Sequence, residues 1–205
     1  MTAAPTPIRI DIDPQTSVSA LLQAPPDARA AYVLAHGAGA GMGHAFMAAA
    51  AQGLAERGVA TLRYQFPYME RGSKRTDAPA VAHAAVRAAV ARAARELQGL
   101  RLYAGGKSFG GRMTSQAQAA APLAGVEGLV FLGFPLHPDG ASSSTRAEHL
   151  RDVGIPMLFI QGTRDKLADI GRMQALAAEL GGRPTLLESA EAEHSFYVLV
   201  RWGPN

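Results

Sequence analysis

The chain has 205 residues, of which 48% are hydrophobic and 18% charged, and this content is enough for one compact domain over residues 1–205. The formal net charge of +3 is small and the basic residues are dispersed, so we expect no nucleic-acid partner. The chain has no cysteine, which excludes disulfides, thiolate metal sites and cysteine nucleophiles.

The first segment, residues 1–13, carries Pro5, Pro7, Asp11 and Asp13 and lacks the apolar stretch of a signal peptide. No later apolar run approaches the roughly 20 residues that a membrane-spanning helix needs. We therefore expect a cytoplasmic protein without a membrane partner. The oligomeric state does not follow from the sequence.

Eight short apolar runs predict β-strands, and they alternate with longer segments of helical character. The runs are Ile8–Asp13, Ser17–Leu22, Ala31–Ala35, Val59–Tyr64, Arg101–Ala104, Gly128–Leu132, Pro156–Gln161 and Thr185–Glu188. The five runs from Ala31 to Gln161 are mostly continuous in apolar residues, as in parallel strands buried on both faces. The first two runs are more polar, which predicts an antiparallel edge of the sheet.

The predicted helices lie between these strands, at His44–Arg57, Ala78–Leu97, Ser108–Ala121 and Asp169–Leu180. Gly58 and Gly99 follow the first two, in the position where glycine commonly ends a helix. This alternation predicts an α/β fold with a mostly parallel sheet of about eight strands and helices on both faces. The short connection between the sixth and seventh strands predicts that no large cap domain covers the sheet.

The motif that indicates chemistry is Gly106-Lys107-Ser108-Phe109-Gly110, which matches G-x-S-x-G. It directly follows the apolar run Leu102-Tyr103-Ala104 and opens a predicted helix. In this setting a serine sits on a sharp turn with its hydroxyl exposed, and small flanking residues let strand and helix pass closely. We therefore predict that Ser108 is a nucleophile.

A second motif supports this prediction. His36-Gly37-Ala38-Gly39 follows the strand that ends at Ala35, where an H-G-x-G turn supplies one backbone N–H of an oxyanion hole. We predict that the N–H groups of Ala38 and Phe109 are the two donors. Each such donor typically contributes about 3–4 kcal/mol to transition-state stabilisation.

An aspartate and a histidine complete the pattern, since Asp165 and His194 each follow a predicted strand. The order Ser108, Asp165, His194 is the order in which such triads occur on sheets of this kind. His194 would accept the serine proton and return it to the leaving group, while Asp165 would stabilise the imidazolium. Asp169 and Glu191 are alternatives for the acid, although Asp169 is the expected cap of the helix that starts near it.

Further pocket residues are predicted from their positions beside strand ends. Phe66, Tyr68, Phe134 and His137 are the candidate walls of a shallow, open substrate pocket. His137 precedes Asp165 in the chain, which is the wrong order for the histidine of the triad.

Other function classes match less well. Gly106-Lys107-Ser108 also resembles the end of a phosphate-binding loop, but Arg101 stands where that motif requires its first glycine. The glycines at 37, 39, 41 and 43 do not have the spacing of a dinucleotide-binding fingerprint. None of the six histidines is paired one helical turn from another, so we expect no metal and no cofactor. A domain of the same fold that binds partners without catalysis is the alternative.

These motifs resemble those of dienelactone-hydrolase-like α/β-hydrolases. More narrowly, they resemble a family of small predicted hydrolases that includes testis-expressed protein 30 and a domain of regulatory subunit 3 of the NSL chromatin complex. The matching segments are His36-Gly37-Ala38-Gly39-Ala40, Arg63–Tyr68, Gly105–Arg112, Phe134–Pro138 and Gln161–Asp165.

The resemblance implies an α/β-hydrolase fold, a triad of Ser108, Asp165 and His194, and hydrolysis of an ester-like bond in a small acyl substrate. Ser108 stands where the dienelactone hydrolases have cysteine, so the resemblance does not extend to dienelactone activity. We expect an esterase or thioesterase-like enzyme. The scissile bond, whether ester, thioester, lactone or amide, and the acyl length stay open.

Overall fold

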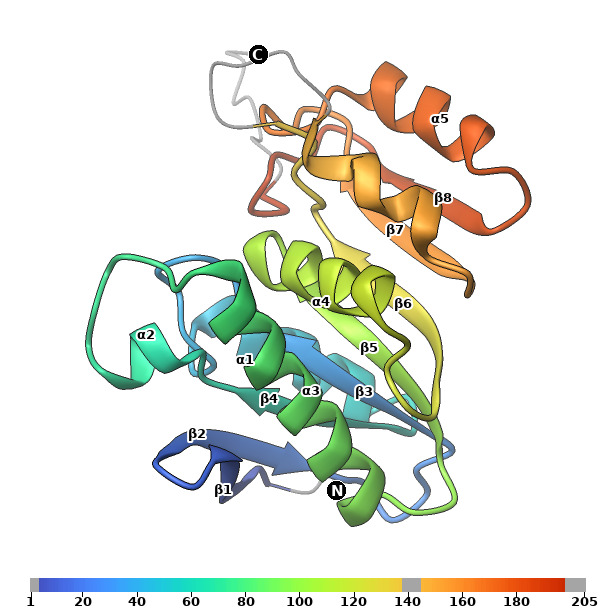
Figure 1. Cartoon of the computed structure of the whole chain (residues 1–205). Coiled ribbons are helices and arrows are strands. Elements are labelled where there is room, and N and C mark those ends of the chain that lie inside the picture. Colours follow the sequence, from blue (N-terminus) through green and yellow to red (C-terminus); the bar gives the residue numbers. More distant parts are fainter. Residues whose placement is uncertain (1–3, 138–144, 198–205) are drawn as a thin grey trace, which may run out of the picture.

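The computed structural model describes residues 4–137 and 145–197, and its centre is an eight-stranded sheet (Figure 1). The strands are β1 Thr6–Asp13, β2 Thr16–Gln23, β3 Ala30–Ala35, β4 Val59–Tyr64, β5 Arg101–Lys107, β6 Val126–Leu132, β7 Met157–Gly162 and β8 Pro184–Ser189. Their order across the sheet is β1-β2-β4-β3-β5-β6-β7-β8. From β4 to β8 neighbouring strands pair in parallel, whereas β2 pairs antiparallel with both β1 and β4. The predicted parallel sheet with an antiparallel edge is confirmed.

The helices are α1 Ala45–Ala55, α2 Pro67–Glu70, α3 Pro79–Glu96, α4 Phe109–Ala120 and α5 Ile170–Glu179, and the 3-10 helix η1 spans Thr145–Asp152. The four predicted helices are confirmed as α1, α3, α4 and α5, with ends that differ by one or two residues. The sequence did not predict α2 and η1. A single turn that begins at Pro67 and a short 3-10 segment rich in charged residues show no apolar repeat.

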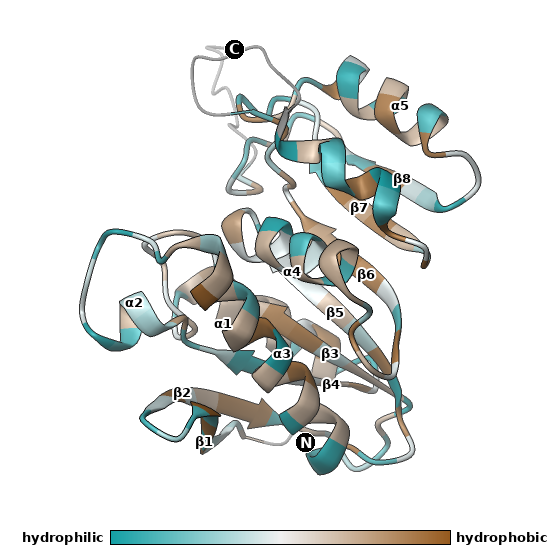
Figure 2. Ribbon diagram, viewed as in Figure 1, coloured by the Kyte–Doolittle hydropathy of each residue, from teal (hydrophilic) through white to brown (hydrophobic). Residues whose placement is uncertain are grey.

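The helices pack on both faces of the sheet, because successive side chains of a strand point to opposite faces. On β3, Ala31, Val33 and Ala35 belong to a large core cluster that includes residues of α3, α4 and α5. Tyr32 and Leu34 of the same strand belong to a smaller cluster with α1. Figure 2 shows brown apolar residues along central strands such as β3 and β6, and teal polar residues interspersed along helices such as α4 and α5.

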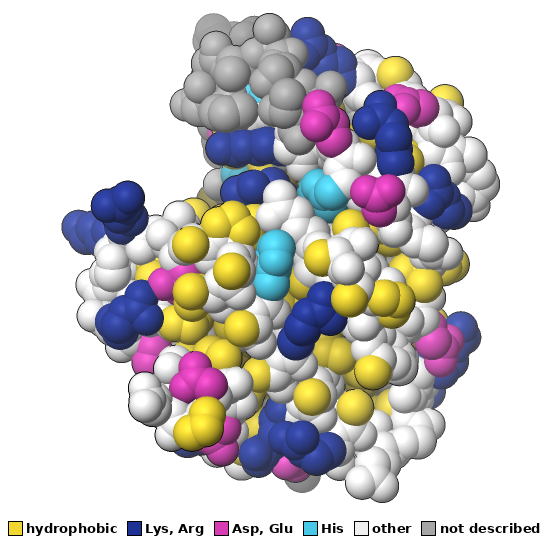
Figure 3. All heavy atoms as spheres, viewed as in Figure 1, with side chains coloured by type: hydrophobic (Ala, Val, Ile, Leu, Met, Phe, Trp, Pro, Cys, Tyr) yellow, Lys and Arg dark blue, Asp and Glu magenta, His cyan; other side chains and the backbone are white. Residues whose placement is uncertain are grey.

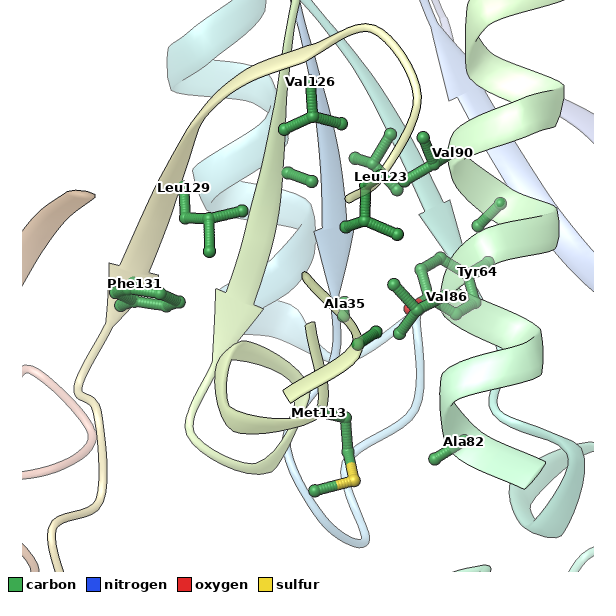
Figure 4. Close-up of a cluster of buried hydrophobic side chains, with 14 of the residues drawn as sticks. Ala35, Tyr64, Ala82, Val86, Val90, Met113, Leu123, Val126, Leu129 and Phe131 are labelled. Atoms are coloured by element: carbon green, nitrogen blue, oxygen red, sulfur yellow. The ribbon is translucent and has the colours of Figure 1, made fainter. Parts of the chain in front are cut away.

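The larger cluster fixes the position of α3 and α4. The buried face of α3 carries mainly alanine and valine: Ala82, Ala85, Val86, Ala89, Val90 and Ala93. Met113 of α4 and Phe131 of β6 lie in the same cluster (Figure 4). Small side chains allow a helix to approach its neighbours closely. Both helices therefore pack closely in the core cluster on one face of the sheet.

The described residues between β6 and β7 form a loop and η1, and within residues 4–137 and 145–197 no cap domain stands over the sheet. Charged side chains of both signs are scattered over the face seen in Figure 3. No helix in the described ranges combines the length and apolar character that a bilayer span requires. The carboxyl ends of the parallel strands meet at one edge of the sheet, which is where open α/β sheets place their ligand sites.

Candidate active site

Ser108 lies on a sharp turn between β5 and α4, which we call the elbow. Its backbone has a φ of 49° and a ψ of −113°, a conformation that costs a non-glycine residue of order 1–3 kcal/mol. A Cβ atom at Gly106 would lie 2.2 Å from the carbonyl oxygen of Ala35, and one at Gly110 would lie 2.6 Å from the same oxygen. Only glycine therefore allows β3, β5 and α4 to approach closely enough to form the elbow.

The structure brings together the three side chains that were predicted as a triad. The hydroxyl oxygen of Ser108 lies 2.9 Å from Nε2 of His194, and Nδ1 of His194 lies 2.7 Å from Oδ2 of Asp165. The three residues follow β5, β7 and β8, so three separate strand ends supply one hydrogen-bonded chain. The side chain of Asp165 is fully buried, and that of His194 is 25% exposed. Such a chain can carry a proton from serine to histidine while water is kept from the carboxylate.

Two further donors hold the carboxylate of Asp165. The side-chain amide of Gln161 donates to Oδ2 at 2.6 Å, and the N–H of Leu167 donates to Oδ1 at 2.8 Å. Gln161 is fully buried, and its amide oxygen accepts a hydrogen bond from the N–H of Phe134 at 2.9 Å. Because this amide is fixed at both ends, the carboxylate oxygen that faces His194 has little freedom to turn. The sequence analysis did not identify Gln161.

Both alternative acids have other partners. The carboxylate of Asp169 accepts a hydrogen bond from the N–H of Arg172 at 3.0 Å and caps α5, as expected. Glu191 forms an ion pair with Arg164. Within residues 4–137 and 145–197, no three His, Cys, Asp or Glu side chains are grouped as metal ligands.

A buried histidine anchors the loop after β3. Nδ1 of His36 donates to the carbonyl oxygen of Gly37 at 2.7 Å, and Nε2 accepts from the N–H of Phe66 at 3.1 Å. Burial lowers the pKa of His36 to about 4, so at neutral pH the ring is neutral, with one donor and one acceptor nitrogen. The hydroxyl of Tyr68 accepts a hydrogen bond from the N–H of Gly39 at 3.1 Å. These contacts fix the path of the loop.

A cavity of about 470 Å³ opens in front of Ser108. Its walls come from the loop after β3, α1, the elbow and the loops after β7 and β8: Gly37, Ala38, Ala40, His44, Phe46, Met47, Lys107, Ser108, Leu167, His194, Ser195 and Tyr197. Of the two predicted oxyanion donors, Ala38 lines the cavity and Phe109 is the first residue of α4. None of the described lining residues carries a carboxylate, and much of the wall is apolar.

The predicted pocket walls are wrong. Phe66, Tyr68 and Phe134 are almost fully buried, His137 is 8% exposed, and none of the four lines the cavity. Phe66 packs edge-on against Phe109 with ring centroids 5.2 Å apart, so it supports the elbow from the core side. Although these aromatic side chains follow strand ends, burial in the core is more favourable for such large apolar surfaces than exposure in a pocket. Other apolar residues line the cavity, and no local sequence motif identifies them.

A second serine–histidine contact lies about two turns further along α4. The hydroxyl oxygen of Ser115 lies 2.7 Å from Nε2 of His149 in η1. Ser115 is fully buried, and its hydroxyl donates to the carbonyl oxygen of Arg112 at 3.0 Å. Burial, assisted by the charges of Arg112 and His83, lowers the pKa of His149 to about 4. This contact joins α4 to η1 and offers a substrate no access.

Several solved structures share this fold. A lidless α/β serine hydrolase from Xanthomonas campestris is 21% identical, with a TM-score of 0.74 over 96% of this chain and 88% of that chain. Dienelactone hydrolase from Anabaena variabilis is 22% identical, with a TM-score of 0.78 over 96% and 90% of the two chains. Est1E from Butyrivibrio proteoclasticus is 17% identical, with a TM-score of 0.70 over 93% and 90%. At these identities the likeness concerns the fold.

Sequence comparisons give the family. No curated protein matches the chain. A family model described as an alpha/beta hydrolase domain matches residues 28–205, which include β3 to β8 and all three residues of the hydrogen-bonded chain. The chain therefore belongs to this family of α/β-hydrolase domains.

Proposed function

We propose that the protein is a serine-dependent hydrolase that cleaves a carboxylic ester or a similar acyl bond of a small molecule through an acyl-enzyme. The observation that carries this proposal is the hydrogen-bonded chain from Ser108 through His194 to the buried Asp165. The cavity in front of Ser108 and the family membership support it further.

In the acylation step, the hydroxyl oxygen of Ser108 attacks the carbonyl carbon while its proton moves to Nε2 of His194. The carbonyl electron pair moves onto oxygen, and the N–H groups of Ala38 and Phe109 stabilise this oxyanion together with the positive end of the α4 dipole. Asp165 balances the charge of the imidazolium. The intermediate then collapses, and the leaving alcohol departs with the proton from Nε2.

In the deacylation step, water replaces the alcohol. His194 takes a proton from the water as its oxygen attacks the acyl carbon, and a second oxyanion forms on the same two donors. The bond between the acyl carbon and the oxygen of Ser108 then breaks, and Ser108 recovers its proton from Nε2. The products are a carboxylic acid and the free enzyme.

The lining of the cavity favours a small, mainly apolar acyl group. Phe46, Met47, Leu167 and Tyr197 supply apolar surface, and the described lining residues include no carboxylate that would attract a cationic substrate. Est1E has been solved with ferulic acid bound, so an aromatic acyl ester belongs among the test substrates.

The test is reaction of the folded protein with a fluorophosphonate probe, followed by identification of the labelled residue by mass spectrometry. We expect one label per chain, at Ser108. Ser115 and Ser195 are internal controls, because Ser115 contacts a histidine but is buried and Ser195 lines the cavity without such a contact. If folded protein stays unlabelled at Ser108, the proposal fails in favour of a non-catalytic binding domain of the same fold.

Fresh, unlabelled protein would then be assayed with p-nitrophenyl esters of increasing acyl length, a methyl ester of an aromatic acid, a thioester and a lactone. The ratio kcat/KM across this series ranks the scissile bonds, since it reports differential binding of the transition state. We expect short p-nitrophenyl esters to be cleaved. If the protein hydrolyses none of the test substrates, the proposal is contradicted.

A further inference from the structure

Lys107 is an ionisable residue of the site that the proposed reaction does not use. It is the last residue of β5, directly before Ser108, and is only 9% exposed. Burial lowers the pKa of Lys107 to about 8, because the ammonium is partly withdrawn from water. A charged group in this position needs contacts that compensate for its lost hydration.

The main contact is to the residue that faces Ser108. Nζ of Lys107 donates a hydrogen bond to the main-chain carbonyl oxygen of His194 at 2.6 Å. A bond from a charged donor is roughly twice as strong as a neutral one. The same ammonium lies 6.0 Å from the ring centroid of Phe46 and 5.6 Å from that of Phe196, at cation–π distance. Lys107 therefore connects the elbow with α1 and with the loop of His194.

The ammonium and the imidazole face the same small space. A Cβ atom at Gly133 would lie 3.0 Å from Nζ of Lys107 and 3.4 Å from Nδ1 of His194. Gly133 has a φ of 65°, in the region that favours glycine, and its lack of a side chain leaves room for both groups. The position of one group consequently constrains the position of the other.

The loop after β8, which carries His194, is otherwise anchored on the side of Asp165. Two hydrogen bonds of 3.0 and 2.9 Å join it to the turn after β7, from the N–H of Arg164 to the carbonyl of Ala192 and from the N–H of Glu191 to the hydroxyl of Thr163. Toward the elbow, the hydrogen bonds of the described residues are those of Ser108 and Lys107 alone. Without Lys107, the serine side of the loop is held by the stacking of Phe196 on Phe46, with ring centroids 5.7 Å apart, and its one described hydrogen bond to the elbow is the contact that reacts.

We propose that Lys107 is a positioning residue, whose ammonium holds the main chain of His194 so that the imidazole stays at hydrogen-bonding distance from Ser108. This inference rests on the proposed serine-hydrolase function. Displacement of a reacting group by about 1 Å can lower a rate about 100-fold. Lys107 is one of the twelve residues that line the cavity, so loss of this anchor slows turnover far more than it changes substrate binding.

The test compares Lys107→Met, which keeps an unbranched apolar stem and removes the donor, with Lys107→Arg, which keeps a charged donor. Lys74→Met, which changes an exposed lysine that does not line the cavity, is the matched control. Active sites are titrated with the fluorophosphonate, and kcat per titrated site and KM are measured with a p-nitrophenyl ester. We expect Lys107→Met to lower kcat about 100-fold with KM nearly unchanged. Lys107→Arg should restore most of this loss, and Lys74→Met should behave like wild type.

The outcomes separate the inference from the function on which it rests. If wild-type protein is not labelled at Ser108, the proposed function falls and the inference with it. If wild type is labelled and Lys107→Met retains wild-type kcat per titrated site, the inference alone is overturned, even when fewer molecules fold. Lys107→Gln, whose shorter side chain cannot place a donor at the same point, repeats the measurement if Lys107→Met fails to fold. A wild-type kcat in that variant has the same consequence.

Discussion

Among residues 4–137 and 145–197, two serine–histidine contacts have similar lengths, 2.9 Å at Ser108, which precedes α4, and 2.7 Å at Ser115 within it. Ser108 lies on a strained turn at the mouth of a cavity, whereas Ser115 is fully buried inside α4. The histidine beside Ser108 contacts a buried carboxylate, and the hydroxyl of Ser115 donates to a backbone carbonyl. The distance between serine and histidine therefore does not identify a nucleophile. Exposure, backbone conformation and a third partner make the difference.

The largest effect should come from Ser108, and Ser115 is its comparison. Ser108→Ala removes the attacking oxygen, and we expect hydrolysis to fall by a factor on the order of 10⁶, as for other serine triads. Ser115→Ala removes a buried hydroxyl that no substrate reaches, so activity should persist while the free energy of unfolding drops by about 1 kcal/mol. Ester hydrolysis measures the activity of the two variants, and urea unfolding measures their free energy of unfolding. Loss of activity in Ser115→Ala with an intact fold would reverse the comparison.

The next effect concerns the acid. Asp165→Asn keeps the shape of the side chain but disturbs the histidine tautomer, and kcat should fall about 10⁴-fold. Asp152→Asn, which changes an exposed carboxylate near His149, is the matched control and should leave kcat unchanged. Steady-state kinetics of the two variants decide the point. Equal activity of Asp165→Asn and wild type would show that another group orients His194.

A smaller effect is expected from the glycine that makes the elbow possible. Gly110→Ala places a Cβ atom 2.6 Å from the carbonyl oxygens of Ala35 and His36, so β3 and α4 must move apart. We expect a loss of about 3 kcal/mol in the free energy of unfolding, the upper end for overpacking. Gly154→Ala, where no atom lies within 4 Å of the added carbon, should cost far less. Urea unfolding of both variants tests this, and similar stabilities would contradict close packing at the elbow.

The smallest effect concerns the buried contact of His149. Its pKa is lowered to about 4 in the folded state, so between pH 6.5 and 4 the unfolded chain binds the proton more readily. Stability linked to this ring is complete above the unfolded pKa and is lost as the pH falls toward 4. We expect His149→Gln to reduce the acid-induced loss in the free energy of unfolding by about 1 kcal/mol. The expected value is small because the ring is partly exposed to solvent, which screens its charge.

The measurement is urea unfolding of wild type and His149→Gln at several pH values from about 7 to about 4. His36, whose pKa is lowered in the same direction, titrates in both proteins and cancels in the difference. His44→Gln is the control, because His44 is exposed at the start of α1. Parallel curves for wild type and His149→Gln would mean that the half-buried ring of His149 does not couple folding to proton binding.

The sequence by itself determined the succession of strands and helices along the chain, the parallel sheet with its antiparallel edge, and the elbow. Continuous apolar runs and glycine spacing are local signals, and burial on both faces of a sheet leaves few alternatives for such runs. It also singled out Ser108, Asp165 and His194, because parallel strands bring their carboxyl ends to one edge whatever the details of packing.

Only the tertiary structure decided which side chains surround these three residues. It moved Phe66 and Phe134 from the expected pocket wall into the core, and it placed Phe46 of α1 in the wall instead. It also joined Lys107 to His194 and Gln161 to Asp165. Contacts of this kind depend on strand order, loop path and the competition for burial, which act between distant parts of the chain and leave no periodic mark in the sequence.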